Sequence, residues 1–177
     1  MNHLDIFEHE GKRFRVYIEP DDCGDTPWER SEGHGKVRTI SEHYRCDTTQ
    51  KKPGERVLYT GGNKVWLYDW QDACKQARKD GWNAPPYDAP NRIERAVQAD
   101  FDFLRGWLND DWWYVGVCVA MVNEDDEDIT EKYTNALWGI ESNADEYLDE
   151  TAHELAGQVE APQLCPHCGA VMKGKKG

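Results

Sequence analysis

The chain has 177 residues, which suits one domain, or one domain with a short tail, and allows a hydrophobic core of its own. Eight tryptophans, eight tyrosines and four phenylalanines supply large apolar area, which argues against wholesale disorder. The formal net charge of −13 argues against direct binding to nucleic acid or to an anionic membrane, because both require a positive surface.

Hydrophobic periodicity and turn residues predict the elements along the chain. Alternation over residues 13–19 predicts a half-buried strand, whereas the turn-rich stretch 21–35 predicts a long loop. Asp69 and Gly81 are expected to cap one helix, Asn91 the next, and Ser142 or Asn143 the last. In chain order we expect strands at residues 13–19, 37–40, 56–60, 64–68, 112–122 and 135–140, with helices over 70–80, 92–108 and 144–159.

Residues 112–122 form the longest uninterrupted apolar run, rich in β-branched and aromatic residues. Such a run predicts a central strand that is covered on both faces. At 11 residues it is too short to cross a bilayer, and the polar, acidic N-terminus does not resemble a signal peptide. We therefore expect no membrane contact and a reducing cytoplasm, where six cysteines are free, buried or metal-bound.

These elements predict an α+β fold: one antiparallel sheet of about five or six strands with two or three helices packed on it. The single domain is expected to span residues 1–160. Residues 161–177 are expected to form a short basic tail with a Cys-x-x-Cys motif.

The negative charge is concentrated in one segment. Residues 1–123 hold 21 acids and 17 bases, whereas residues 124–160 hold 13 acids and one base, Lys132. On the last helix, five carboxylates span about 13.5 Å, a charge density within about a factor of two of duplex DNA. A basic protein partner is expected to bind the carboxylates of Glu124, Asp125, Asp126, Glu127, Asp128, Asp145, Glu146, Asp149, Glu150 and Glu154. The alternative is a solvated helix face that only keeps the protein in solution.

A second candidate site is the loop that contains Glu29, Glu32 and His34, because acids and a histidine between glycines can serve as acid, base or metal ligands. The alternative is a surface loop anchored by Trp28. The sequence contains no nucleophile elbow, phosphate loop or dinucleotide fingerprint, so we expect a protein that is not an enzyme. A small hydrolase or metal-dependent enzyme stays the alternative.

The third candidate is Cys165-x-x-Cys168, which is half of a tetrahedral zinc site. Its other two ligands are expected to be His43 with Cys46, or Cys23, or the same cysteine pair of a second chain, which would give a zinc-linked adaptor homodimer. The alternative is a flexible tail with two free thiols.

Several short phrases of the sequence resemble a family of small acidic proteins encoded by tailed bacteriophages, hypothetical proteins without an established activity. The phrases are residues 25–30 (DTPWER), 33–35 (GHG), 52–57 (KPGERV), 80–82 (DGW), 101–104 (FxxL), 137–142 (LWGIES) and 147–148 (YL). The resemblance covers most of residues 5–160 and implies a phage protein that works in the cytoplasm of a bacterial host. With the acidic segment, it leads us to expect a DNA mimic that inhibits or redirects a basic host protein, such as a nuclease, a defence complex or a transcription component.

Overall fold

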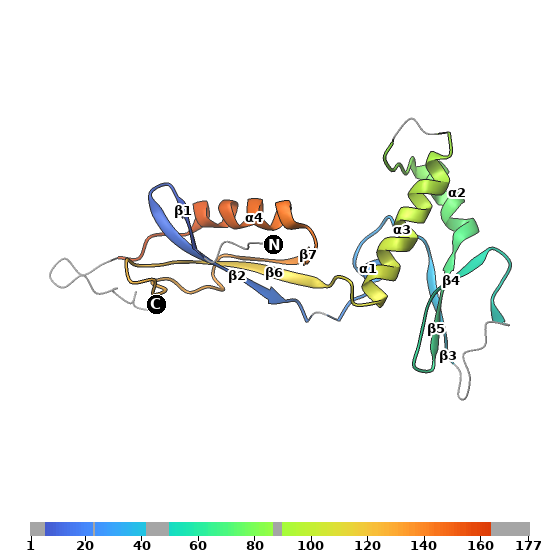
Figure 1. Cartoon of the computed structure of the whole chain (residues 1–177), viewed down its shortest axis with the longest axis horizontal. Coiled ribbons are helices and arrows are strands. Elements are labelled where there is room, and N and C mark those ends of the chain that lie inside the picture. Colours follow the sequence, from blue (N-terminus) through green and yellow to red (C-terminus); the bar gives the residue numbers. More distant parts are fainter. Residues whose placement is uncertain (1–5, 23, 42–49, 87–89, 164–177) are drawn as a thin grey trace, which may run out of the picture. The chain divides into compact units, whose positions relative to one another are not determined.

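The computed structural model describes residues 6–22, 24–41, 50–86 and 90–163, which fold into seven strands and four helices (Figure 1). The α+β class predicted from the sequence is confirmed. The chain divides into two compact units, the first made of residues 1–23 and 113–177 and the second of residues 24–112. The single domain expected over residues 1–160 stays a prediction.

The first unit contains a four-stranded antiparallel sheet in the order β1-β2-β6-β7. Its strands are β1 (Ile6–His9), β2 (Lys12–Pro20), β6 (Tyr114–Met121) and β7 (Ala136–Glu141). The helix α4 (Asp145–Gln158) lies along one face of this sheet (Figure 1). Alternate residues of β6 pack under α4 against Leu148, Ala152 and Leu155 and form the core of the unit.

The other face of β6 is covered by side chains of the neighbouring strands. On this face β6 presents only small side chains after Tyr114, namely Gly116, Cys118 and Ala120. The ring of Trp138 lies directly on Gly116, where an added Cβ would come within 2.3 Å of the indole. All eight residues of β6 are buried, so the prediction of a central strand covered on both faces is confirmed.

The second unit contains a three-stranded antiparallel sheet in the order β3-β5-β4, with β3 (Val37–Ser41), β4 (Glu55–Gly61) and β5 (Lys64–Asp69). The helices α2 (Trp70–Asp80) and α3 (Arg92–Leu108) share a core with β4 and β5. Asp69 caps α2 by accepting the backbone N–H of Asp72 at 2.9 Å, and Gly81 ends the helix in the left-handed conformation, both as predicted.

The structure differs from the prediction in the number of sheets. The sequence predicts one sheet of about five or six strands, whereas the described residues form two sheets, of four and three strands. Both neighbours of β5 lie close to it in the chain, while β2 pairs with β6 although the whole second unit separates them in the sequence. Periodicity identifies strands but does not choose their partners.

Local differences have local causes. The four-residue β1 is too short to show an alternating pattern, and the short helix α1 (Pro27–Arg30) lies in a stretch predicted as a loop, where Thr26 and Glu29 form a capping box. The N-cap of α4 is Ala144, while the Ser142 hydroxyl accepts a hydrogen bond from the backbone N–H of Trp113 at 3.0 Å. No helix among the described ranges is long and apolar enough to cross a membrane.

A buried ion pair stabilises the second unit. The Arg38 guanidinium contacts both carboxylate oxygens of Glu55 at 2.5 and 2.7 Å, and the backbone N–H of Lys52 donates to the same carboxylate at 2.6 Å. The Glu55 side chain is 4 % exposed. The bond to Arg38 is the main reason that the pKa of Glu55 lies below its usual value of 4.5.

This shift predicts how stability depends on pH. Because the pKa of Glu55 is lower in the folded protein, its contribution is complete above about pH 4.5 and is lost as the pH falls through the folded-state pKa. We expect urea midpoints, followed by tryptophan fluorescence, to fall more between pH 7 and pH 3 in the native protein than in Glu55→Gln. The control is Glu94→Gln, which removes an exposed ion pair with Arg78 of 3.5 Å. An equal fall of the urea midpoint in the native protein and in Glu55→Gln would contradict the prediction.

Candidate functional site

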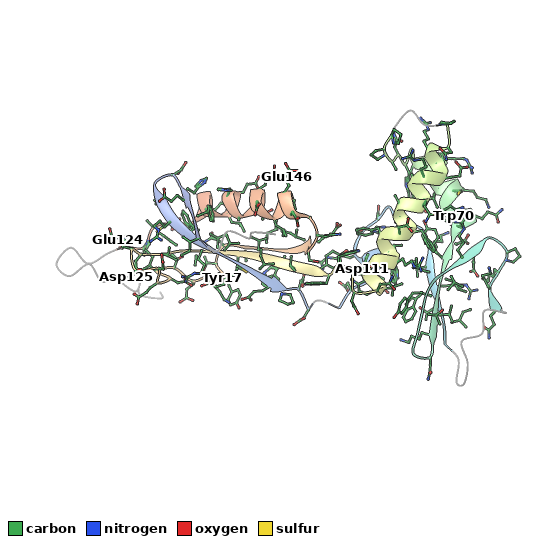
Figure 2. All side chains as sticks on the ribbon, in the orientation of Figure 1. Tyr17, Trp70, Asp111, Glu124, Asp125 and Glu146 are labelled. Carbon is green, nitrogen blue, oxygen red and sulfur yellow. The ribbon has the colours of Figure 1, made fainter. Side chains whose placement is uncertain are left out.

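The exposed side of α4 carries the carboxylates that the sequence singled out. Leu148, Thr151, Ala152, Leu155 and Ala156 of α4 are buried against the unit. The opposite side presents Asp145, Glu146, Asp149, Glu150 and Glu154, all exposed. Figure 2 shows Glu146 directed away from the sheet. Within the described part of the chain, none of these five carboxylates forms an ion pair.

Part of this arrangement works against the stability of the helix. Asp145 and Asp149 are four residues apart, as are Glu146, Glu150 and Glu154, so like charges face each other along two rows. Each such pair destabilises a helix by about 0.2–0.5 kcal/mol. The last turn of α4 contains no basic residue that would offset the negative end of the helix dipole. Asp145 and Glu146 lie in the first turn, where the positive end of the dipole offsets part of this cost.

The acidic turn before β7 differs from α4 because the protein's own bases neutralise part of it. Arg13 contacts Asp126 at 2.6 Å, and Arg15 contacts Asp128 at 2.8 Å. The Tyr17 hydroxyl also donates to Asp128, and burial together with this bond raises the pKa of Tyr17. The charges of Asp126 and Asp128 are therefore partly neutralised within the protein.

The remaining acids of the turn are more accessible. Glu127 accepts one hydrogen bond from the Asn123 side chain at 3.1 Å. Glu124 and Asp125 are exposed and lie at the tip of the turn (Figure 2). Of the ten predicted carboxylates, eight form no ion pair within the described part of the chain, and we call these eight the acidic face: Glu124, Asp125, Glu127, Asp145, Glu146, Asp149, Glu150 and Glu154.

The charge is divided very unequally between the two units. By sequence, the first unit holds 19 acids and 7 bases, whereas the second holds 15 acids and 14 bases. Almost all of the net charge of −13 therefore belongs to the unit that carries the acidic face. Long-range attraction would direct a cationic partner to this unit.

The loop that contains Glu29, Glu32 and His34 does not assemble a site from these three residues. The Glu29 carboxylate accepts from the Thr26 hydroxyl at 2.6 Å and serves the capping box of α1. Glu32 is exposed. His34 instead contacts Asp100, with 2.6 Å between its Nδ1 and the Asp100 Oδ1. A catalytic role for the loop stays a prediction.

Asp100 of α3 is a functional contact of this loop that no sequence pattern indicates. Its second oxygen accepts from the backbone N–H of Gly35 at 2.8 Å and from the Tyr68 hydroxyl at 2.6 Å. His34 also stacks on Phe103, with 5.5 Å between ring centroids and 8° between ring planes. Burial first, and then the Asp100 charge, raise the pKa of Tyr68, so its hydroxyl stays a donor at ordinary pH. A carboxylate that accepts from three partners fastens the loop to α3.

The predicted zinc ligands Cys165, Cys168, His43, Cys46 and Cys23 lie outside the described residues, so zinc binding and a zinc-linked dimer stay predictions. Within the described ranges, no group of three or more histidine, cysteine or acidic side chains is arranged to hold a metal ion.

Comparison with known proteins gave no match to any family model, curated protein or solved structure.

Proposed function

We propose that this protein acts by binding a basic partner protein through the acidic face. The partner would be a nucleic-acid-handling protein of a bacterial host, such as a nuclease, a defence complex or a transcription component, and the protein would inhibit or redirect it as a DNA mimic. On this proposal it is a phage accessory protein that works in the host cytoplasm and is not an enzyme.

The observation that carries the proposal is the unpaired state of the α4 carboxylates. Asp126 and Asp128 have arginine partners from β2, whereas the five acids of α4 have no ion-pair partner among the described residues. Their exposed side chains keep their charge available to a ligand. Spaced over about 13.5 Å of rigid helix, they present charge at a density within about a factor of two of duplex DNA.

The helix is also a suitable support for such a surface. Leu148 is 1 % exposed, and Ala152 and Leu155 are buried in the same core, so the packed side of α4 is fixed to the sheet. Charges held on a rigid element lose little conformational entropy when a partner binds. A basic groove that normally accepts DNA or RNA would meet a preformed row of negative charge.

The test is charge reversal on α4. We expect the fourfold variant Asp145→Lys, Glu146→Lys, Asp149→Lys and Glu150→Lys to weaken binding to a captured host partner by at least about 100-fold, because attraction becomes repulsion at the centre of the contact. Binding of the native protein should weaken steeply as salt rises from 50 to 300 mM. Both effects are measured by surface plasmon resonance with the full-length chain.

The matched control changes the same charge on the second unit. The variant Asp25→Lys, Glu32→Lys, Asp80→Lys and Asp102→Lys alters four exposed acids and shifts the net charge equally. It should reduce binding by no more than about tenfold, through the long-range field alone. Equal loss in the two variants, or affinity that does not respond to salt, would exclude the acidic face as the contact.

A further inference from the structure

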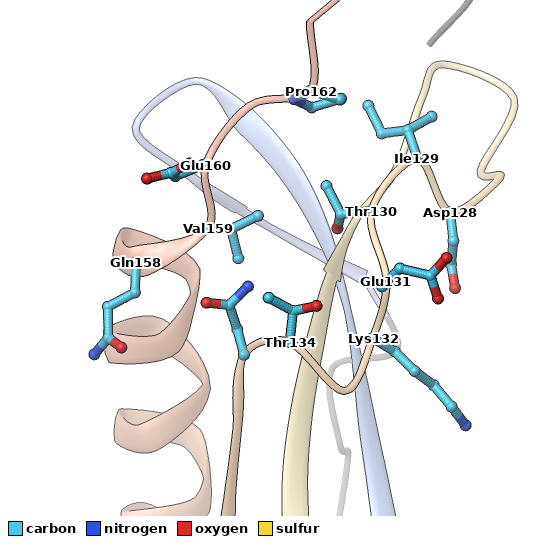
Figure 3. Close-up of a pocket in the computed structure, with 11 residues that line it drawn as sticks. Asp128, Ile129, Thr130, Glu131, Lys132, Thr134, Gln158, Val159, Glu160 and Pro162 are labelled. Carbon is cyan, nitrogen blue, oxygen red and sulfur yellow. The ribbon is translucent and has the colours of Figure 1, made fainter. Parts of the chain in front are cut away.

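A groove of about 860 Å³ lies in the first unit, between the C-terminal end of α4 and the connection that precedes β7 (Figure 3). Val159 and Pro162 line it from the α4 side, and Thr130 and Thr134 line it from the connection. Its volume is in the range of pockets that bind ligands or partner segments. Gln158, which lines the groove, lies one turn after Glu154 of the acidic face on α4.

The wall formed by the connection is held in place by hydrogen bonds to β6. The backbone N–H of Met121 donates to the Thr130 hydroxyl at 2.8 Å, and the Met121 carbonyl accepts from the N–H of Ile129 at 2.8 Å. Further along, the N–H of Val119 donates to the Asn135 carbonyl at 3.0 Å. A groove whose walls are fixed before binding requires little ordering of its own residues when a ligand enters.

Lys132 fixes the middle of the same connection. Its ammonium group forms an ion pair with Glu19 and lies 4.7 Å from the Tyr17 ring and 4.5 Å from the Tyr133 ring. The bond to Glu19 is the main cause of the raised pKa of Lys132. Lys132, the one base of residues 124–160, lines the groove, and Glu19 neutralises its charge there.

Four charged residues line the groove: Asp128 and Lys132 are paired within the protein, whereas Glu131 and Glu160 are not. Val159, Thr130 and Thr134 surround the middle, whereas the carboxylates of Glu131 and Glu160 point outward on opposite sides (Figure 3). Both glutamates are exposed, and neither forms an ion pair within the part of the chain that the structure describes. The negative end of the α4 dipole adds to this potential.

We propose that this groove binds an extended basic segment of the partner protein. A small uncharged side chain would enter between Val159 and Thr134, and lysine or arginine side chains on either side would meet Glu131 and Glu160. An uncharged centre with a charged rim is the usual arrangement of a protein interface. This inference rests on the proposed function and adds a second, shaped contact to the charged surface of α4.

The first experiment uses two short peptides with the isotope-labelled full-length protein. An acetylated, amidated Arg-Val-Lys peptide should shift the backbone amide resonances of Thr130, Thr134 and Asn135, whereas the Glu-Val-Glu peptide should shift none of them. Shifts confined to the exposed side of α4, or no shifts with either peptide, would contradict the proposal that the groove binds a basic segment.

The second experiment places a cation and extra volume in the groove. Thr134 is exposed, so Thr134→Arg should leave the fold intact while reducing affinity for the Arg-Val-Lys peptide about tenfold. The control Thr39→Arg adds the same side chain at an exposed position of β3 and should leave affinity unchanged within about twofold. Equal peptide affinity in both variants would exclude peptide binding in the groove, even if reversal of the α4 charges abolishes partner binding. If reversal of the α4 charges does not change partner binding, the proposed function is excluded instead.

Discussion

Replacing Asp100 with alanine should destabilise the second unit by about 3–5 kcal/mol, one of the two largest effects we expect from a single substitution. The change leaves three donors without their acceptor: the Nδ1 of His34, the backbone N–H of Gly35 and the Tyr68 hydroxyl. Tyr68 is fully buried, so water cannot replace the lost bond without opening the core. Urea unfolding followed by tryptophan fluorescence measures this effect, because six of the eight tryptophans lie in residues 24–112.

The control for Asp100→Ala is Asp102→Ala in the same helix. Asp102 is exposed and accepts one hydrogen bond from Gln98 at 2.9 Å, so its removal should change the free energy of unfolding by no more than about 0.5 kcal/mol. A similar loss in both variants would mean that Asp100 does not fasten the loop. The loss in free energy of unfolding would then come from placing an alanine in α3 and not from the lost hydrogen bonds.

Replacing Leu148 with alanine should destabilise the first unit by about 3 kcal/mol. Leu148 is 1 % exposed and packs in the core formed by α4 and the four-stranded sheet, so the shorter side chain leaves a cavity there. Hydrogen exchange at the backbone amides of β6 measures the loss, because this strand lies at the centre of the unit.

The control is Tyr147→Ala, at the preceding position of the same helix. Tyr147 is 53 % exposed, so its loss should change exchange at β6 by less than about 1 kcal/mol. The two variants also distinguish an effect on folding from an effect on binding. Leu148→Ala should weaken partner binding only to the extent that it unfolds α4. Greater protection loss in Tyr147→Ala than in Leu148→Ala would mean that α4 packs through another side.

The sequence predicted elements well where the pattern was long. The apolar run of β6 and the stripe of α3 extend over many residues, so one or two exceptions do not hide them. Tyr147 of α4 is exposed although it stands next to the buried Leu148, because one apolar residue beside a stripe carries no information about which way it points. Short elements such as β1 offered no pattern at all.

The site was less predictable because its decisive contacts join residues far apart in the chain. His34 and Asp100 are 66 positions apart, and Arg13 and Asp126 are 113 apart. Composition could locate the acidic segment but could not tell which of its carboxylates have arginine partners, since that depends on the register of β2 against β6. The spacing of five acids along one helix required only helical periodicity, so it was correctly predicted.

The first unit is built from two separate parts of the chain, which constrains the order in which the units can fold during synthesis. Pro20, at the end of β2, is paired with Val115 of β6, yet the ribosome must synthesise all of residues 24–112 between them. Residues 6–20 emerge first and have no central strand to join until β6 follows. The second unit, whose strands and helices are contiguous, can fold during this interval. The carboxylates of α4 take their place only after β6 has joined β2, because α4 packs on a completed β6.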